Sequence, residues 1–165
     1  MKMTKMFVAL LFTVGVSAAR GEYRQVNMTV FGMDCAPCAH AIHVSMTGIA
    51  GVSAVNVDLN TGLVAITLAP GNSADMRQFN SAVEENGFTH KDADVTVRGE
   101  ITGSASAPVL EVTGTKDQYA LTPLKASVDV SGLIGKTVMV EGVIPQSAKG
   151  KVAGTLRYKT IKEAQ

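Results

Sequence analysis

"VNMTVFGMDCAPCAHAIHVSMTGI", residues 26–49, contains both cysteines of the chain, Cys35 and Cys38. Before the cysteines, apolar residues alternate along "VNMTVF", which predicts a half-buried strand preceded by a polar lead-in at residues 21–25. After them, apolar residues recur at spacings of four, four and three, which predicts one face of a helix. The cysteine pair therefore lies where a strand ends and a helix begins.

The next segments extend this strand and helix into a larger unit. Residues 52–59 and 63–68 are strand-like runs joined by a turn that contains glycine. Ser73 is expected to cap a second helix that Gly87 ends, and another strand follows. Val26 to Val97 thus reads β-α-β-β-α-β, the order of the ferredoxin-like unit with four antiparallel strands and two helices on one face.

The C-terminal part of the chain has a different pattern. Its five strand-like runs are residues 95–101, 108–114, 118–122, 136–144 and 154–162, with a short helical turn expected within 126–135. Five strands with that interruption predict a small all-β barrel of the OB type. We therefore expect an α+β protein with a ferredoxin-like domain at residues 22–97 and an OB-like β-barrel domain at 98–165. No linker is expected, because the strand pattern runs straight through residues 94–101.

The N-terminus has the pattern of a signal peptide over residues 1–19. A short basic start precedes an apolar run, and small residues follow it at Ser17, Ala18 and Ala19. The mature chain is expected to be exported, to a bacterial periplasm, with membrane contact only through the signal before cleavage. Loss of Lys2 and Lys5 changes the formal charge from +1 to −1. This nearly neutral charge argues against a nucleic-acid partner.

The cysteines have the setting of a reactive dithiol. Pro37 suits the start of a helix, and the helix N-terminus is expected to lower the pKa of Cys38 by favouring its thiolate. Two thiolates without further fixed ligands suit Cu(I) or Hg(II), whereas structural Zn(II) usually takes four protein ligands. Asp34 is the nearby oxygen donor that would help bind an ion of higher coordination number.

The run "GMDCAPC", set between a strand and a helix, resembles the metal-binding loop of the heavy-metal-associated domain family. This family includes copper chaperones, N-terminal domains of metal-transporting ATPases and periplasmic mercury-binding proteins. The resemblance covers Val26 to Val97 and includes "GVSAVNVDLNTGLVAITL" and "ENGF". It implies that Cys35 and Cys38 are the metal ligands.

The resemblance also implies roles for three neighbours of the cysteines. Met33 would pack under the loop as a core residue, and Phe88 would lie beside the site, either as a lid or as ordinary core. Asp34 occupies a position that is often threonine or serine in copper-binding members and aspartate in some zinc, lead or cadmium ATPase domains. Cu(I) and Hg(II) are therefore favoured, with Zn(II), Cd(II) and Pb(II) as alternatives.

Other interpretations of the cysteine pair remain open. Cys-Ala-Pro-Cys also resembles the motif of thiol-disulfide oxidoreductases, although no aromatic residue directly precedes Cys35 and no later strand-proline element follows. The pair could instead form a permanent disulfide, or merely tune an adaptor whose barrel does the main work. His40, His43 and His90 are expected to be solvated surface residues, with His40 and His43 as a weak secondary metal site.

We expect a non-enzymatic protein, since no arrangement typical of catalysis accompanies the cysteines. Its predicted function is to capture a soft metal ion and pass it by thiolate exchange to a metal-transporting membrane protein or another metal acceptor. A monomer is expected, with a metal-bridged dimer as the alternative. The barrel is expected to serve as a docking or structural module.

Overall fold

The computed structural model describes residues 22–125 and 128–164, so the predicted signal peptide lies outside the described residues. Within them, no helix is both long enough and apolar enough to cross a membrane. The elements, in chain order, are β1 (Glu22–Phe31), α1 (Ala36–Thr47), β2 (Val52–Asp58), β3 (Leu63–Leu68), α2 (Met76–Glu84), β4 (Thr89–Ser104), β5 (Ala107–Glu111), β6 (Gln118–Pro123), a 3₁₀ turn η1 (Ser131–Leu133), β7 (Thr137–Ile144) and β8 (Thr155–Glu163).

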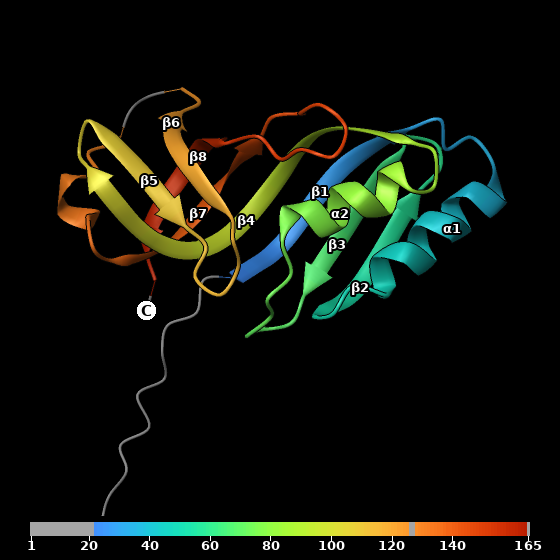
Figure 1. The fold of residues 1–165 in the computed structure, drawn as a ribbon, viewed down its shortest axis with the longest axis horizontal. Helices are drawn as coiled ribbons and strands as arrows, with labels where there is room; N and C mark the ends of the chain where they lie inside the picture. The colour runs from blue at the N-terminus through green and yellow to red at the C-terminus, as the bar shows by residue number, and fades with distance from the viewer. Residues whose placement is uncertain (1–21, 126–127, 165) are drawn as a thin grey trace, which may run out of the picture.

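The N-terminal half has the predicted ferredoxin-like arrangement. Its strands lie in the order β2-β3-β1-β4, and every neighbouring pair is antiparallel. Figure 1 shows α1 and α2 side by side on one face of these strands. Ile42 and Met46 of α1 are buried, as the helical spacing predicts, and pack in one core with Phe79 and Val83 of α2. This confirms the β-α-β-β-α-β order.

The first strand begins earlier than the sequence predicts. Residues 22–25, which we expected to be a polar lead-in, belong to β1 and pair with β4. Tyr23 is fully buried, and its ring meets that of Phe79 edge to face at 6.3 Å. Glu22 is also buried, where it pairs with Arg24 and accepts a hydrogen bond from the amide of Gly71. The polar sequence of residues 22–25 does not indicate a strand, because the residues that pair with it lie in distant segments.

The second helix is capped by a different residue from the one expected. Asp75, not Ser73, is the N-cap of α2: its side chain accepts a hydrogen bond from the amide of Gln78 at 2.9 Å. The Gln78 side chain in turn accepts one from the Asp75 amide at 3.0 Å, which completes a capping box. These two hydrogen bonds satisfy two backbone amides at the start of α2. Ser73, two residues before the N-cap, makes neither of them.

Strand β4 joins the two halves of the molecule. It runs without interruption across the predicted domain boundary between residues 97 and 98, and that boundary remains a prediction. Beyond it, β4 pairs with β5, β5 with β6, β6 with β8, β8 with β7, and β7 again with β4. The β6–β8 pairing is parallel and the others are antiparallel. The five predicted strands of this half are confirmed, and their pairings return to the strand from which they start.

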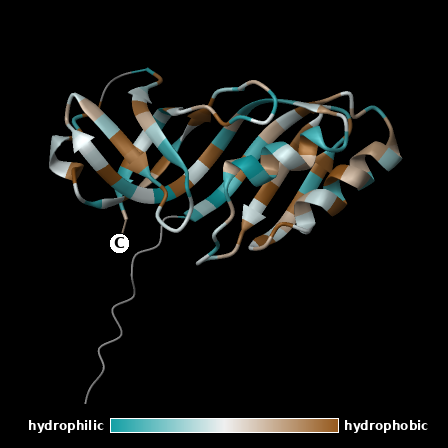
Figure 2. Cartoon of the chain, viewed as in Figure 1, coloured by the Kyte–Doolittle hydropathy of each residue, from teal (hydrophilic) through white to brown (hydrophobic). Residues whose placement is uncertain are grey.

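Alternating burial and two glycines allow the strands of the C-terminal half to pack closely. Hydrophobic and hydrophilic residues alternate along these strands (Figure 2), so one side of each faces the core. A Cβ at Gly99 would lie 2.5 Å from the carbonyl oxygen of Glu111, and one at Gly142 would lie 2.6 Å from that of Arg157. Larger residues at these two positions would push β5 and β8 away from their neighbours.

The two halves meet in a buried polar cluster. The hydroxyl of Tyr23 donates to Asp117 at 2.6 Å and lies 2.7 Å from the hydroxyl of Tyr119. The same Asp117 oxygen accepts the amide of Met76, the first residue of α2, at 2.9 Å. An aspartate of the C-terminal half therefore binds the N-terminal end of a helix in the N-terminal half.

Candidate metal centre

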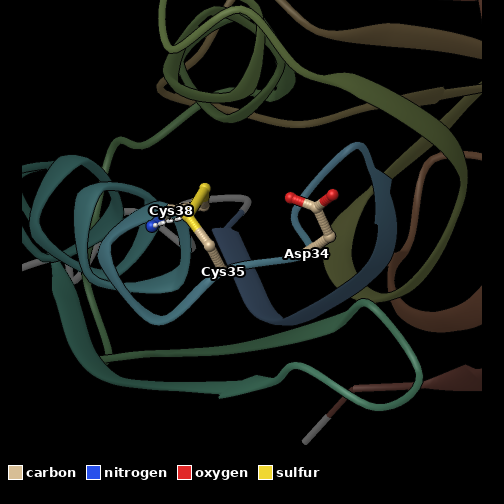
Figure 3. A group of neighbouring side chains, drawn as sticks. All are labelled: Asp34, Cys35 and Cys38. Carbon is tan, nitrogen blue, oxygen red and sulfur yellow. Dashed lines mark hydrogen bonds between the residues drawn. A yellow bond between two sulfur atoms is a disulfide. The ribbon is translucent and has the colours of Figure 1, made fainter.

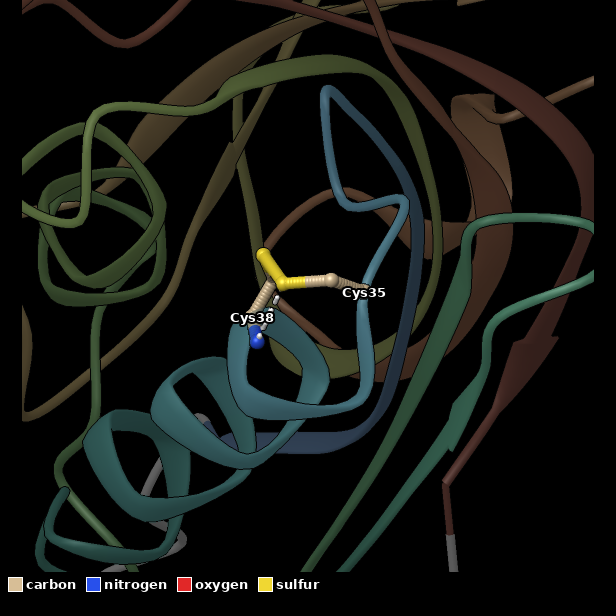
Figure 4. The surroundings of a disulfide bond; sticks show 2 residues. All are labelled: Cys35 and Cys38. Carbon is tan, nitrogen blue, oxygen red and sulfur yellow. Dashed lines mark hydrogen bonds between the residues drawn. A yellow bond between two sulfur atoms is a disulfide. The ribbon is translucent and has the colours of Figure 1, made fainter.

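The cysteine pair lies in the metal loop, defined here as residues 32–38, between β1 and the first turn of α1 (Figure 4). The loop turns at Gly32, whose φ of +86° is a left-handed conformation that favours glycine. Cys35 and Cys38 are joined by a disulfide, and both side chains are partly exposed. The structure therefore shows the oxidised pair, and binding of a metal by two thiolates requires its reduction.

Cys35 rather than Cys38 makes the direct contact with the helix N-terminus. Cys35 is the N-cap residue of α1, and its sulfur accepts a hydrogen bond from the amide of Cys38 at 3.2 Å. Pro37 lies in the first turn, where its missing N–H leaves no helical bond unmade. The sequence indicated stabilisation of the Cys38 thiolate, whereas the observed N–H contact favours negative charge on the Cys35 sulfur.

Asp34 brings an oxygen to the two sulfurs. One ligand atom from each of Asp34, Cys35 and Cys38 lies within 4.8 Å of the others, and Asp34 is exposed (Figure 3). Across residues 22–125 and 128–164, this is the group of three or more metal-ligating side chains that the structure brings together. Two soft donors and one hard donor can hold soft or borderline ions.

Met33 and Phe88 support the loop from the protein side. The Met33 side chain is buried in the core, and Phe88 is half-buried and packs against the same core. A Cβ placed at Gly32 would lie 3.4 Å from the ring of Phe88, so this ring borders the metal loop directly. Phe88 is thus both a core residue and a neighbour of the loop.

Two of the three histidines are exposed, and the third is not. His40 and His43 lie on the exposed side of α1, as expected. His90 is 5% exposed, so the expectation that it is a solvated surface residue is wrong. Its Nε2 lies 3.6 Å from Glu84 Oε1, and its Nδ1 lies 3.1 Å from the carbonyl oxygen of Lys91.

Sequence reasoning did not identify the contacts that Glu84 and Lys91 make. The ammonium group of Lys91 lies 4.2 Å from the centre of the exposed Phe31 ring, at the end of β1. Glu84 accepts the amide of Gly150, which is 66 positions later in the chain. The Phe31–Lys91 contact follows from the register of β1 and β4, whereas no local pattern indicates the Glu84 contact.

The N-terminal half of the chain is similar to known proteins. The model of the heavy-metal-associated domain matches residues 27–89. The copper chaperone CopZ of Staphylococcus saprophyticus is 34% identical over 65 residues, which are 39% of this chain and 94% of that protein. A solved CopZ metallochaperone is 28% identical over 39% of this chain and 94% of its own, with a TM-score of 0.37. Oxidised MerP from Ralstonia metallidurans CH34 is 22% identical over 42% of this chain and 94% of its own, with a TM-score of 0.38.

The fold of the N-terminal half, with a cysteine pair at the start of its first helix, is that of a small metal-binding domain. This chain belongs to the heavy-metal-associated domain family. Members of the family are in general non-enzymatic metal carriers. The family match and the cysteine pair together support metal binding and transfer as the general function.

Proposed function

We propose that the protein captures a soft metal ion between the thiolates of Cys35 and Cys38 and transfers it to another protein. The observation that carries this proposal is the cysteine pair at the N-terminus of α1, in a loop that places both sulfurs at the protein surface. A reductant must first supply two electrons to the disulfide, which releases two thiolates. The two sulfurs then bind the ion with room for further ligands.

Transfer would proceed by ligand exchange. A thiolate of the acceptor adds to the two-coordinate metal, and a three-coordinate intermediate forms before one cysteine leaves. No redox change at the metal and no release of free ion are required. An acceptor with its own cysteine pair at an exposed loop fits this chemistry, and a metal-transporting membrane protein is our proposed acceptor.

We propose Cu(I) as the preferred metal and Hg(II) as the second candidate. Support comes from the soft thiolate pair and from the 34% identity to a copper chaperone over most of that protein's length. Asp34 supports binding of Zn(II), Cd(II) or Pb(II) as well, because its carboxylate lies within reach of a third ligand position. Metal preference is thus proposed to depend on whether Asp34 coordinates the ion.

We also propose that the protein works outside the cytoplasm, in a bacterial periplasm, after loss of residues 1–19. The basic and apolar pattern of those residues supports export. For the C-terminal half we propose an OB-like barrel. Its support is the return of the strand pairings to β4, together with one parallel pair among antiparallel ones. This half is proposed to act as a structural or docking module.

Competitive titration of the reduced protein with Cu(I), Hg(II) and Zn(II) tests the central proposal. We expect tight binding of one ion per protein, and loss of that binding in Cys35→Ser. The variant Ser45→Ala, on the opposite end of α1, serves as a control that retains both cysteines. Absence of tight binding to all three ions in the reduced protein would remove the proposal.

The disulfide favours a second candidate function, thiol-disulfide exchange. The pair is oxidised in the structure, and the Cys35 sulfur accepts an amide that would stabilise a leaving thiolate. The insulin reduction assay separates the two functions. Rapid catalytic turnover, lost in Cys35→Ser, would favour an oxidoreductase, whereas reduction no faster than by free dithiol would leave metal transfer.

A further inference from the structure

The β7–β8 loop, residues 145–154, lies against α2 of the metal-binding half. Arg77 Nη1 donates to the carbonyl of Gly150 at 3.2 Å, and Asn80 Nδ2 donates to that of Lys151 at 3.1 Å. The amide of Gly150 donates to Glu84 Oε2 at 2.9 Å. Spacings of three and four residues place these three side chains on one face of α2. Figure 1 shows the loop reaching from the C-terminal half toward this helix.

Internal hydrogen bonds fix the shape of the β7–β8 loop. Ser147 Oγ donates to the carbonyl of Lys151 at 2.6 Å, and Gly150 adopts a φ of +72°. At the start of the loop, the amide of Gln146 donates to Asp92 of β4 at 2.8 Å. The loop is therefore held to the metal-binding half at both α2 and β4.

Glu84 links this loop to the strand pair that leads into the metal loop. Its Oε2 binds Gly150, while its Oε1 lies 3.6 Å from His90 Nε2. The side chains of Glu84 and His90 are 11% and 6% exposed, so both are largely shielded from water. His90 lies opposite Val30 in the β1–β4 ladder, and Val30 is two residues before Gly32.

Phe88 lies between the metal loop and the β7–β8 loop. On one side its ring borders Gly32. On the other side it lines a cavity of about 250 Å³, together with Glu84, His90 and the segment from Gln146 to Lys149. The amide of Phe88 donates to the carbonyl of Val83 in α2 at 3.2 Å, so the position of Phe88 follows that of the helix end.

We propose that the β7–β8 loop, acting through Glu84 and His90, holds Phe88 against the metal loop and thereby slows release of a metal ion from Cys35 and Cys38. This inference rests on the proposed function and gives the C-terminal half a role in it. A competing ligand must approach the metal from outside the loop, and a fixed Phe88 limits how far the loop opens. Glu84, His90 and Phe88 are positioning residues in this scheme.

Release of Cu(I) from the reduced, loaded full-length protein to a coloured Cu(I) chelator tests this role in stopped flow. Glu84→Ala removes the acceptor of the Gly150 amide and the partner of His90. We expect release about three- to tenfold faster, the range that loss of one hydrogen bond allows. Glu84→Gln keeps an oxygen acceptor for Gly150, and its release rate is expected to lie close to that of the unaltered protein.

The control is Glu163→Ala, which removes an exposed carboxylate that is paired with Lys136. Glu163 lies opposite Val138, at the end of the β7–β8 pair remote from the β7–β8 loop. Equal acceleration in Glu84→Ala and Glu163→Ala, or none in Glu84→Ala, would overturn the proposal. If Glu84→Ala does not fold, Arg77→Ala replaces it, because Arg77 makes its loop contact from an exposed position.

Amide hydrogen exchange in the reduced, metal-free protein separates this inference from the proposed function. Glu84→Ala is expected to exchange faster at Gly32 and Phe88, with no change at Val97 in the middle of β4. If the reduced protein binds none of Cu(I), Hg(II) and Zn(II), the proposed function fails, and exchange alone then decides whether the β7–β8 loop positions Phe88. Unchanged exchange at Gly32 and Phe88 would overturn the positioning role, whether or not Cu(I) binds.

Discussion

The hydroxyl of Tyr23 donates a 2.6 Å hydrogen bond to Asp117, which lies 94 residues later in the chain. Tyr23 belongs to the strand that leads into the metal loop, and Asp117 belongs to the turn between β5 and β6. The same carboxylate binds the first amide of α2. Through this contact, the two halves share a buried polar cluster and do not merely touch at their surfaces.

Tyr23→Phe is expected to lower the free energy of unfolding by about 1–3 kcal/mol, because it leaves buried partners without a donor. Both halves are expected to unfold in one transition, since the cluster and β4 join them. Urea unfolding followed by far-UV circular dichroism and by the fluorescence of the remaining tyrosines measures both quantities. Lys136→Ala, which breaks an exposed ion pair, is the control and should cost less than about 1 kcal/mol. Two separate transitions would contradict the expected coupling.

Alkaline pH is expected to destabilise the protein through two tyrosines. Burial is the main cause that raises the pKa of both Tyr23 and Tyr119 well above the ordinary tyrosine value. The charge of Tyr119 and then that of Asp117 add to it at Tyr23, and the charge of Asp117 adds to it at Tyr119. Above about pH 10 the unfolded chain therefore loses protons that the folded protein keeps, and the free energy of unfolding falls by up to about 1.4 kcal/mol per pH unit for each tyrosine. Below about pH 10 both states hold these protons, so the contribution is constant.

Urea unfolding between pH 8 and pH 11.5 measures this dependence. The double variant Tyr23→Phe/Tyr119→Phe is less stable at pH 8, yet it is expected to lose stability less steeply above pH 10. Equal slopes for the two proteins would show that other groups cause the alkaline loss.

The reduced protein is expected to react with iodoacetamide faster at Cys35 than at Cys38. The amide of Cys38 donates to the Cys35 sulfur, and this bond favours the thiolate, which is the reactive form. Mass spectrometry of the alkylated peptides at short times measures the ratio. The single variants Cys35→Ser and Cys38→Ser report each thiol alone, and faster reaction of Cys38 in both comparisons would contradict the prediction.

Asp34→Asn is expected to change metal preference without removing metal binding. Loss of a charged oxygen ligand should weaken Zn(II) binding by roughly tenfold or more, because Zn(II) needs ligands beyond two sulfurs. Cu(I) binding, which two thiolates satisfy, should change less than about threefold. Competition titrations with both ions on the reduced protein measure the two affinities. An equal loss for both ions would mean that Asp34 acts through the loop rather than as a ligand.

The ferredoxin-like order of elements and the place of the cysteine pair could both be predicted from the sequence. Both follow from local patterns: alternation before Phe31, helical spacing after Cys38, and a glycine turn at Gly62 with a φ of +71°. The order of helices and strands in residues 26–97 could therefore be predicted correctly, and so could the positions of all five C-terminal strands. Asp34, Cys35 and Cys38 lie within five consecutive residues, so their proximity required no tertiary information.

Tertiary structure alone decided how the halves are joined and what surrounds the site. Residues 22–25 form a strand because they pair with residues far along the chain, and His90 is buried in a strand that pairs with distant β1; no local period reveals either pairing. The return of the strand pairings to β4 and the contact between Glu84 and Gly150 depend in the same way on geometry and register, whereas the capping of α2 by Asp75 is a local contact with Gln78 that the sequence could have indicated. The local pattern thus specifies the metal loop, whereas long-range packing decides what holds Phe88 beside it.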